Sequence, residues 1–130
     1  MSVNPLSFVS IPTTAVTEAG IIPGRPFAVD DGVLGILVRM YFPGAINTNS
    51  LNIRLQTFVG NGATGEWRDY IADTSSRGNA NDWFVYFGES PDMALSNNGH
   101  AVALPRVLRA SVNANNANAA TFALDGVWTR

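Results

Sequence analysis

The sequence of 130 residues has no cysteine and no lysine, and it has only one histidine. Without cysteine the chain has no disulfide and no thiolate that could act as a nucleophile or bind a metal. A single histidine without cysteine also argues against structural zinc, which takes four nitrogen or sulfur ligands. All eight basic residues are therefore arginine, which suits protein interfaces better than lysine, although a compositional bias of the source explains the same usage.

Charge is scarce as well, at 14% of the residues and a formal net charge of −2. Nucleic-acid binding calls for a basic stripe, so we expect no nucleic-acid partner. The longest apolar run, residues 33–42, contains Gly35 and Arg39 and is too short to span a bilayer. The N-terminal residues lack a charged segment followed by an apolar one, so we expect neither a signal peptide nor a membrane partner.

Helical spacing of apolar residues is nearly absent, and glycine, proline and asparagine interrupt the chain at short intervals. This pattern predicts one all-β domain, an antiparallel β-sandwich or jelly-roll-like domain of about seven or eight strands with an extended N-terminal arm. Residues 1–20 carry Pro5 and Pro12, which cannot donate to a strand ladder, and are predicted to be the arm or an edge strand. Residues 21–130 are predicted to form the sandwich.

Three segments carry the clearest strand and turn signals. Residues 33–42 are apolar on both faces, which predicts a central strand. Residues 51–56 alternate strictly between apolar and polar side chains, as in a strand with one face on the core. Residues 60–65 are rich in glycine and predict a hairpin tip.

Two Asp-Gly pairs predict further turns. Residues 30–32 read as a tight hairpin turn, because Asp-Gly supplies the positive φ that such turns need. Asp125-Gly126 is expected to bend the chain within its last segment. The strands at 106–112 and 121–124 are expected to form a closing hairpin.

The sequence shows little that predicts catalysis. His100 lies in an Asn-Asn-Gly-His stretch, and no Gly-x-Ser-x-Gly motif accompanies it, so we expect a solvated or interface histidine. Acidic residues gather at 66–73 and 89–92 without a glycosidase pattern, and the spacing of an EF-hand calcium site is absent. No phosphate-binding glycine motif is present. We therefore predict that the chain is not an enzyme and uses neither a cofactor nor a metal.

Aromatic side chains leave two interpretations open. Trp67, Trp83, Tyr86 and Trp128 could form a platform on which a sugar stacks. The same residues could instead fill the core of a small sandwich, which is the simpler interpretation. Asparagine crowds several predicted loops, where it either stabilises turns or docks uncharged loop tips on a partner.

The order of several segments resembles a known class of proteins. Leu-x-Ile-x-Leu-Gln at 51–56 precedes the glycine-rich tip and Trp67, and Ala-Thr-Phe-Ala-Leu stands at 120–124. The most specific segment is Leu-Pro-Arg-x-Leu-Arg-Ala-x-Val at 104–112. Over roughly residues 33–128 the chain resembles small β-sandwich virion proteins of tailed bacteriophages, of the capsid decoration or cement type.

The resemblance implies a structural protein that binds the phage major capsid protein on the capsid exterior, after synthesis in the bacterial host cytoplasm. It implies no cofactor, and it favours a homotrimer. The capsid or subunit contacts would lie on the N-terminal arm, at Leu6, Phe8, Ile11 and Pro12. Arg106 and Arg109 would lie on one strand and point to opposite faces, so that only one of them serves a given contact.

Other functions remain as alternatives at this point. The second hypothesis is a carbohydrate- or receptor-binding β-sandwich module of a phage fibre or tail, which would use the aromatic platform. The third hypothesis is a small hydrolase, which has the least support.

Overall fold

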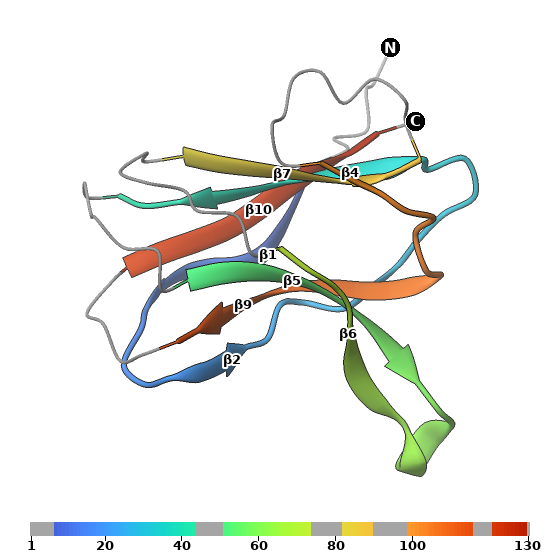
Figure 1. Ribbon diagram of the computed structural model, residues 1–130, viewed down its shortest axis with the longest axis horizontal. Coiled ribbons are helices and arrows are strands. Elements are labelled where there is room, and N and C mark those ends of the chain that lie inside the picture. Colours follow the sequence, from blue (N-terminus) through green and yellow to red (C-terminus); the bar gives the residue numbers. More distant parts are fainter. Residues whose placement is uncertain (1–6, 44–50, 74–81, 90–98, 116–120, 130) are drawn as a thin grey trace.

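The computed structural model describes residues 7–43, 51–73, 82–89, 99–115 and 121–129. In these residues the regular structure is almost entirely strand, with one short 3-10 helix, η1 (Gly62–Thr64). Two sheets pack face to face, which confirms the predicted all-β sandwich (Figure 1). No helix in the described part of the chain has the length and apolarity needed to cross a membrane. The strands are β1 (Ser7–Ala15), β2 (Gly20–Ile22), β3 (Phe27–Ala28), β4 (Gly35–Tyr41), β5 (Leu51–Val59), β6 (Glu66–Ala72), β7 (Asp82–Gly88), β8 (Gly99–Ala101), β9 (Val107–Ala114) and β10 (Thr121–Thr129).

Sheet A has the strand order β1-β10-β4-β7-β8, and sheet B has the order β2-β9-β5-β6, with β3 also paired to β9. Strands β2 and β3 lie on the same side of β9, and the segment between them contains Pro23 and Pro26. They are two halves of one strand that the prolines interrupt, because proline cannot donate to the ladder. Strand β8 is a short parallel addition at the edge of sheet A. With β2 and β3 counted as one strand and β8 left aside, the described residues contribute eight strands to the sandwich.

The chain passes repeatedly from one sheet to the other. It runs from β1 in sheet A to β2 and β3 in sheet B and back to β4 in sheet A. Strands β5 and β6 form a hairpin in sheet B, β7 returns to sheet A, and β9 and β10 again lie in different sheets. This passage of the chain between two sheets is the arrangement found in a jelly roll.

Because the chain passes repeatedly between the two sheets, two of the predicted hairpins need correction. The closing hairpin was wrong, because β9 and β10 belong to different sheets. The turn at residues 30–32 is present, with Gly32 at φ +89°, but it carries the chain from sheet B to sheet A. The hairpin tip at residues 60–65 is confirmed, since it joins β5 to β6 within one sheet.

The core lies between the two sheets and follows from the alternation of the strands. On the central strand β4, Ile36, Val38 and Met40 point inward and are at most 1% exposed. Ile53 and Leu55 on β5 meet them from the other sheet and are fully buried. Leu34, which the period of two along a strand would place on the same inner face, lies before β4 and is 42% exposed.

The N-terminal segment is an edge strand in the part that the structure describes. Strand β1 pairs with β10, and Ile11 and Val16 are each only 3% exposed in the core. Phe8 packs against Phe27 and Trp128, with ring centroids 5.0 and 5.1 Å away. Residues 7–15 are thus part of the sandwich, and an arm that reaches a neighbour would have to come from outside these residues.

The bend expected at Asp125-Gly126 was wrong, because β10 runs without a break from Thr121 to Thr129. Gly126 faces the closely packed neighbouring strands, where a Cβ would lie 2.5 Å from the carbonyl oxygen of Leu37. The glycine therefore serves a close approach of strands rather than a turn.

Candidate functional site

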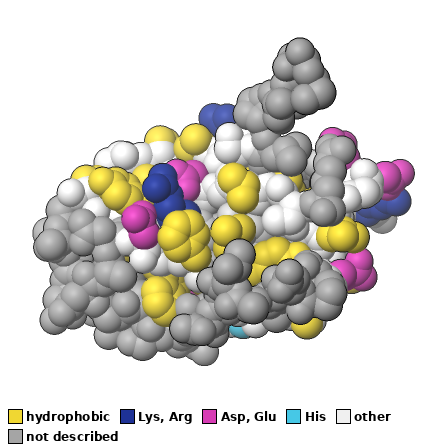
Figure 2. All heavy atoms as spheres, turned by 90° about the horizontal axis from the view of Figure 1, so that it is seen from above, with side chains coloured by type: hydrophobic (Ala, Val, Ile, Leu, Met, Phe, Trp, Pro, Cys, Tyr) yellow, Lys and Arg dark blue, Asp and Glu magenta, His cyan; other side chains and the backbone are white. Residues whose placement is uncertain are grey.

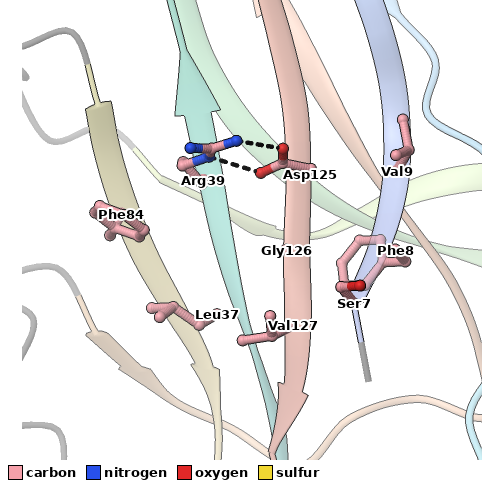
Figure 3. Close-up of a pocket in the computed structure, with 9 residues that line it drawn as sticks. All are labelled: Ser7, Phe8, Val9, Leu37, Arg39, Phe84, Asp125, Gly126 and Val127. Carbon is pink, nitrogen blue, oxygen red and sulfur yellow. Dashed lines mark hydrogen bonds and ion pairs between the residues drawn. The ribbon is translucent and has the colours of Figure 1, made fainter. Parts of the chain in front are cut away.

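The outer face of sheet A forms a shallow, mostly apolar hollow of about 490 Å³, which we call the sheet A groove (Figure 3). Four neighbouring strands place Val9, Asp125, Arg39 and Phe84 side by side across it. Val9 is 54% exposed and Phe84 is 44% exposed. Seen from this side, apolar side chains surround one basic side chain between acidic ones (Figure 2). The groove is lined by Ser7, Phe8, Val9, Leu37, Arg39, Phe84, Asp125, Gly126 and Val127.

An ion pair lies at the centre of the groove. The Arg39 Nε and Nη2 atoms donate to the two carboxylate oxygens of Asp125 at 2.9 and 2.6 Å. The guanidinium also lies 3.5 Å from Asp82 and 5.1 Å from the ring centroid of Tyr41. The hydrogen bond to Asp125 raises the pKa of Arg39 above its ordinary value, so the cation persists. With two carboxylates and one guanidinium, this centre carries a net charge of −1.

The hairpin of β5 and β6 extends beyond the two layers, on the side away from sheet A (Figure 1). Near its tip, Phe58 and Val59 are 37% and 53% exposed. The Phe58 ring meets the edge of Trp67 at a centroid distance of 5.5 Å and lies over Gly65, where a Cβ would collide with it. We call Phe58, Val59 and Trp67 the hairpin knob.

A polar network covers the outer face of sheet B behind this knob. Arg109 Nε donates to the Gln56 side chain at 2.8 Å, and Gln56 Nε2 donates to Asp69 at 2.9 Å. Arg54 donates to the other oxygen of Asp69 at 2.7 Å. The Arg109 guanidinium lies 4.5 Å from the Trp67 ring centroid, and its burial lowers the pKa of Arg109. Arg109 therefore connects β9 to both strands at the base of the hairpin.

The expected contact residues fall in different places. Leu6 lies outside the described residues. Phe8 is half-buried beside Phe27, Ile11 is buried, and Pro12 is exposed on β1. The Ile11 side chain cannot touch a partner while the sandwich is folded.

The placement of the two arginines on one strand was wrong. Arg106 precedes β9, which begins at Val107, so the alternation of a strand does not relate it to Arg109. Arg106 donates to Asp31 at 2.8 Å, and both of these side chains are more than three-quarters exposed.

His100 is not a solvated loop residue. It lies on β8, and its Nε2 is 3.0 Å from an oxygen of Asp73, which follows β6 and is buried. Its ring stacks on Phe87 with the centroids 5.2 Å apart. Because β8 belongs to sheet A and β6 to sheet B, the His100–Asp73 contact links the edges of the two sheets.

We expect His100→Ala to lower the free energy of unfolding by about 1–3 kcal/mol, because it removes a hydrogen bond to a buried carboxylate. Urea unfolding followed by tryptophan fluorescence measures the change. Arg106→Ala is the matched control, since its exposed pair with Asp31 contributes little and its unfolding midpoint should not move. Equal midpoints for both variants would contradict a structural role for His100.

The four aromatic residues considered as a sugar platform do not share one surface. Trp83 and Trp128 pack against the core, and Tyr86 is only 7% exposed. Trp67 lies on the hairpin. Most of this set therefore serves packing. Among the residues that the structure describes, no three His, Asp or Glu side chains are grouped so that they could hold a metal ion.

Comparisons with known proteins assign the chain to no family. No family model, no curated protein and no solved structure matches the chain.

Proposed function

We propose that this chain is a structural virion protein that binds the capsid surface of a tailed bacteriophage as a decoration or cement protein. It would act by adding buried surface across the shell, after synthesis in the host cytoplasm. Its partners would be the phage major capsid protein and further copies of itself, with a homotrimer as the expected assembly.

One observation carries the proposal: of the nine large apolar side chains that are exposed among the described residues, five lie on two outer surfaces, the sheet A groove and the hairpin knob. Exposed apolar patches on a soluble domain mark surfaces that other proteins cover. A jelly roll is an architecture of viral capsid domains, and also of lectins and cupins. Because a fold does not fix a function, the two surfaces carry more weight than the topology.

The alternative of a carbohydrate- or receptor-binding module has less support. Sugar recognition would draw on aromatic rings that lie flat and open on one surface. Here Trp83 and Trp128 pack against the core, and Trp67 lies apart from them on the hairpin. The arrangement favours protein contact over sugar stacking.

The test is binding of the full chain to expanded shells of its phage that lack the chain. After incubation and pelleting through a sucrose cushion, we expect the chain in the pellet at a fixed ratio to the capsid protein. Bound shells should also disrupt at a higher temperature, because a ligand of the assembled state stabilises it by mass action. A chain that stays in the supernatant, or that binds glycan-coated beads instead, would overturn the proposal.

A further inference from the structure

We propose that the hairpin knob of one copy docks into the sheet A groove of the next, so that copies of the chain associate head to tail. This contact goes beyond the proposed function, because it is a property of the chain alone and does not require a shell.

The first support is where the exposed apolar side chains lie. Nine large hydrophobic residues are exposed among those that the structure describes. Val9, Phe84 and Val127 line the groove, and Phe58 and Val59 belong to the hairpin knob. Five of these nine residues thus belong to the two surfaces that the proposal brings together. The remaining four are Ile21, Leu34, Tyr70 and Val107.

The second support is shape. The groove is a hollow of about 490 Å³, within the range of about 300–1,000 Å³ typical of ligand sites. The hairpin extends past the two layers, so its tip protrudes from the sandwich (Figure 1). Phe58 is held between Trp67 and Gly65, so little conformational freedom remains to be lost when it docks.

The third support is charge. The centre of the groove carries a net charge of −1, and the contact of Asp82 with Arg39, at 3.5 Å, is longer than the 2.6 Å contact of Asp125. The hairpin presents Arg68, whose side chain is 66% exposed and pairs with Glu66 of its own strand, which is itself 60% exposed. An exposed pair of this kind contributes at most about 1 kcal/mol, so Arg68 can turn to Asp82 of the next copy at little cost.

Charge also argues against a symmetric contact of groove with groove, which would bring two negative centres together. The knob and the groove are different patches of the chain, so their contact is heterologous and leaves one of each free at the ends of every dimer. Such contacts close into a ring or continue as an open row. A contact made by one hairpin tip belongs with the small, transient interfaces, so we expect association to become visible at about tens to hundreds of micromolar.

The experiment is sedimentation velocity of the full chain from ~10 to ~500 μM, with two variants at exposed positions. Phe84→Asp blocks the groove and Phe58→Asp blocks the knob. The mean sedimentation coefficient of the wild type should rise with concentration. For each variant alone, the association constant should be at least tenfold lower than that of the wild type. An equimolar mixture of the variants should form a dimer and stop there, because one intact knob and one intact groove remain.

Ile21→Asp is the matched control, because Ile21 is 41% exposed on β2 and lies on neither surface, so this variant should associate like the wild type. Circular dichroism melts establish that the variants are folded, and Val127→Asp and Val59→Asp replace any variant that is not. A wild type that stays monomeric over the whole range would overturn the proposal. So would a mixture that does not dimerise, or loss of association in only one of the two variants.

Discussion

Deletion of residues 1–16 is expected to unfold the domain rather than only to abolish partner binding. It removes β1, which pairs with β10 along sheet A, and with it the buried side chains of Ile11 and Val16. Loss of one buried aliphatic side chain costs about 2–5 kcal/mol, and a domain is stable by only about 5–15 kcal/mol. The loss of both side chains, together with the newly exposed edge of β10, therefore costs as much free energy as the whole domain has to lose on unfolding.

The truncated chain should show no cooperative thermal transition by circular dichroism and no dispersed amide signals in a proton-nitrogen NMR spectrum. Deletion of residues 1–6 is the control, because it leaves β1 and all of its described contacts in place. A 1–16 truncation that melts with the wild-type midpoint would instead mean that β1 is an independent arm.

The sequence allowed a good prediction of the strands, because their signals are local. The alternation in β5 and the two apolar faces of β4 both follow from the period of two along a strand. The sheet in which a strand lies is not local. Strands β9 and β10 follow one another closely in the sequence and still belong to different sheets, and no residue between them reports that choice.

The groove was missed for the same reason. Val9, Arg39, Phe84 and Asp125 come from four strands that meet only through the registers of the folded sheet. One signal was present: Arg39 is a charge within an otherwise apolar central strand. A charge in that position needs a partner, which here is Asp125 on the adjacent strand. The Asp125-Gly126 pair was read as a turn, which hid that partner.

Where β2 and β3 are interrupted, hydrogen bonds outside the ladder satisfy backbone groups of β9 and of the segment at residues 23–26. The Ser10 hydroxyl donates to the carbonyl oxygen of Ala110 at 2.5 Å, and the Gly24 amide donates to the Ser111 hydroxyl at 2.9 Å. The Arg25 amide donates to the Ser10 carbonyl oxygen at 2.9 Å. These bonds connect β1 of sheet A to β9 of sheet B, and we call this contact of Ser10, Gly24, Ala110 and Ser111 the seam. Gly24 lies at its centre.

We expect Gly24→Ala to lower the free energy of unfolding by about 3 kcal/mol, at the upper end of the usual effect of overpacking. The new Cβ would overlap the carbonyl oxygen of Ala110 and the hydroxyl of Ser10, both closer than the 3.0 Å that real Cβ atoms keep. Urea unfolding measures the loss. Gly32→Ala is the control, because a Cβ there would meet no described atom within 4 Å beyond its chain neighbours, and only the strain of its φ of +89°, about 1–2 kcal/mol, applies.

A second substitution identifies which atom resists the new methyl group. If the Ser10 hydroxyl were the obstacle, Ser10→Ala in the Gly24→Ala background would restore most of the lost stability. We expect little recovery, because the Ala110 carbonyl oxygen is the nearer atom and belongs to the backbone of β9, which cannot move without disturbing its pairing with β5. Ser10→Ala also removes the hydrogen bond to that oxygen. Full rescue by the double substitution would show that the seam yields at β1 and that β9 is not held there.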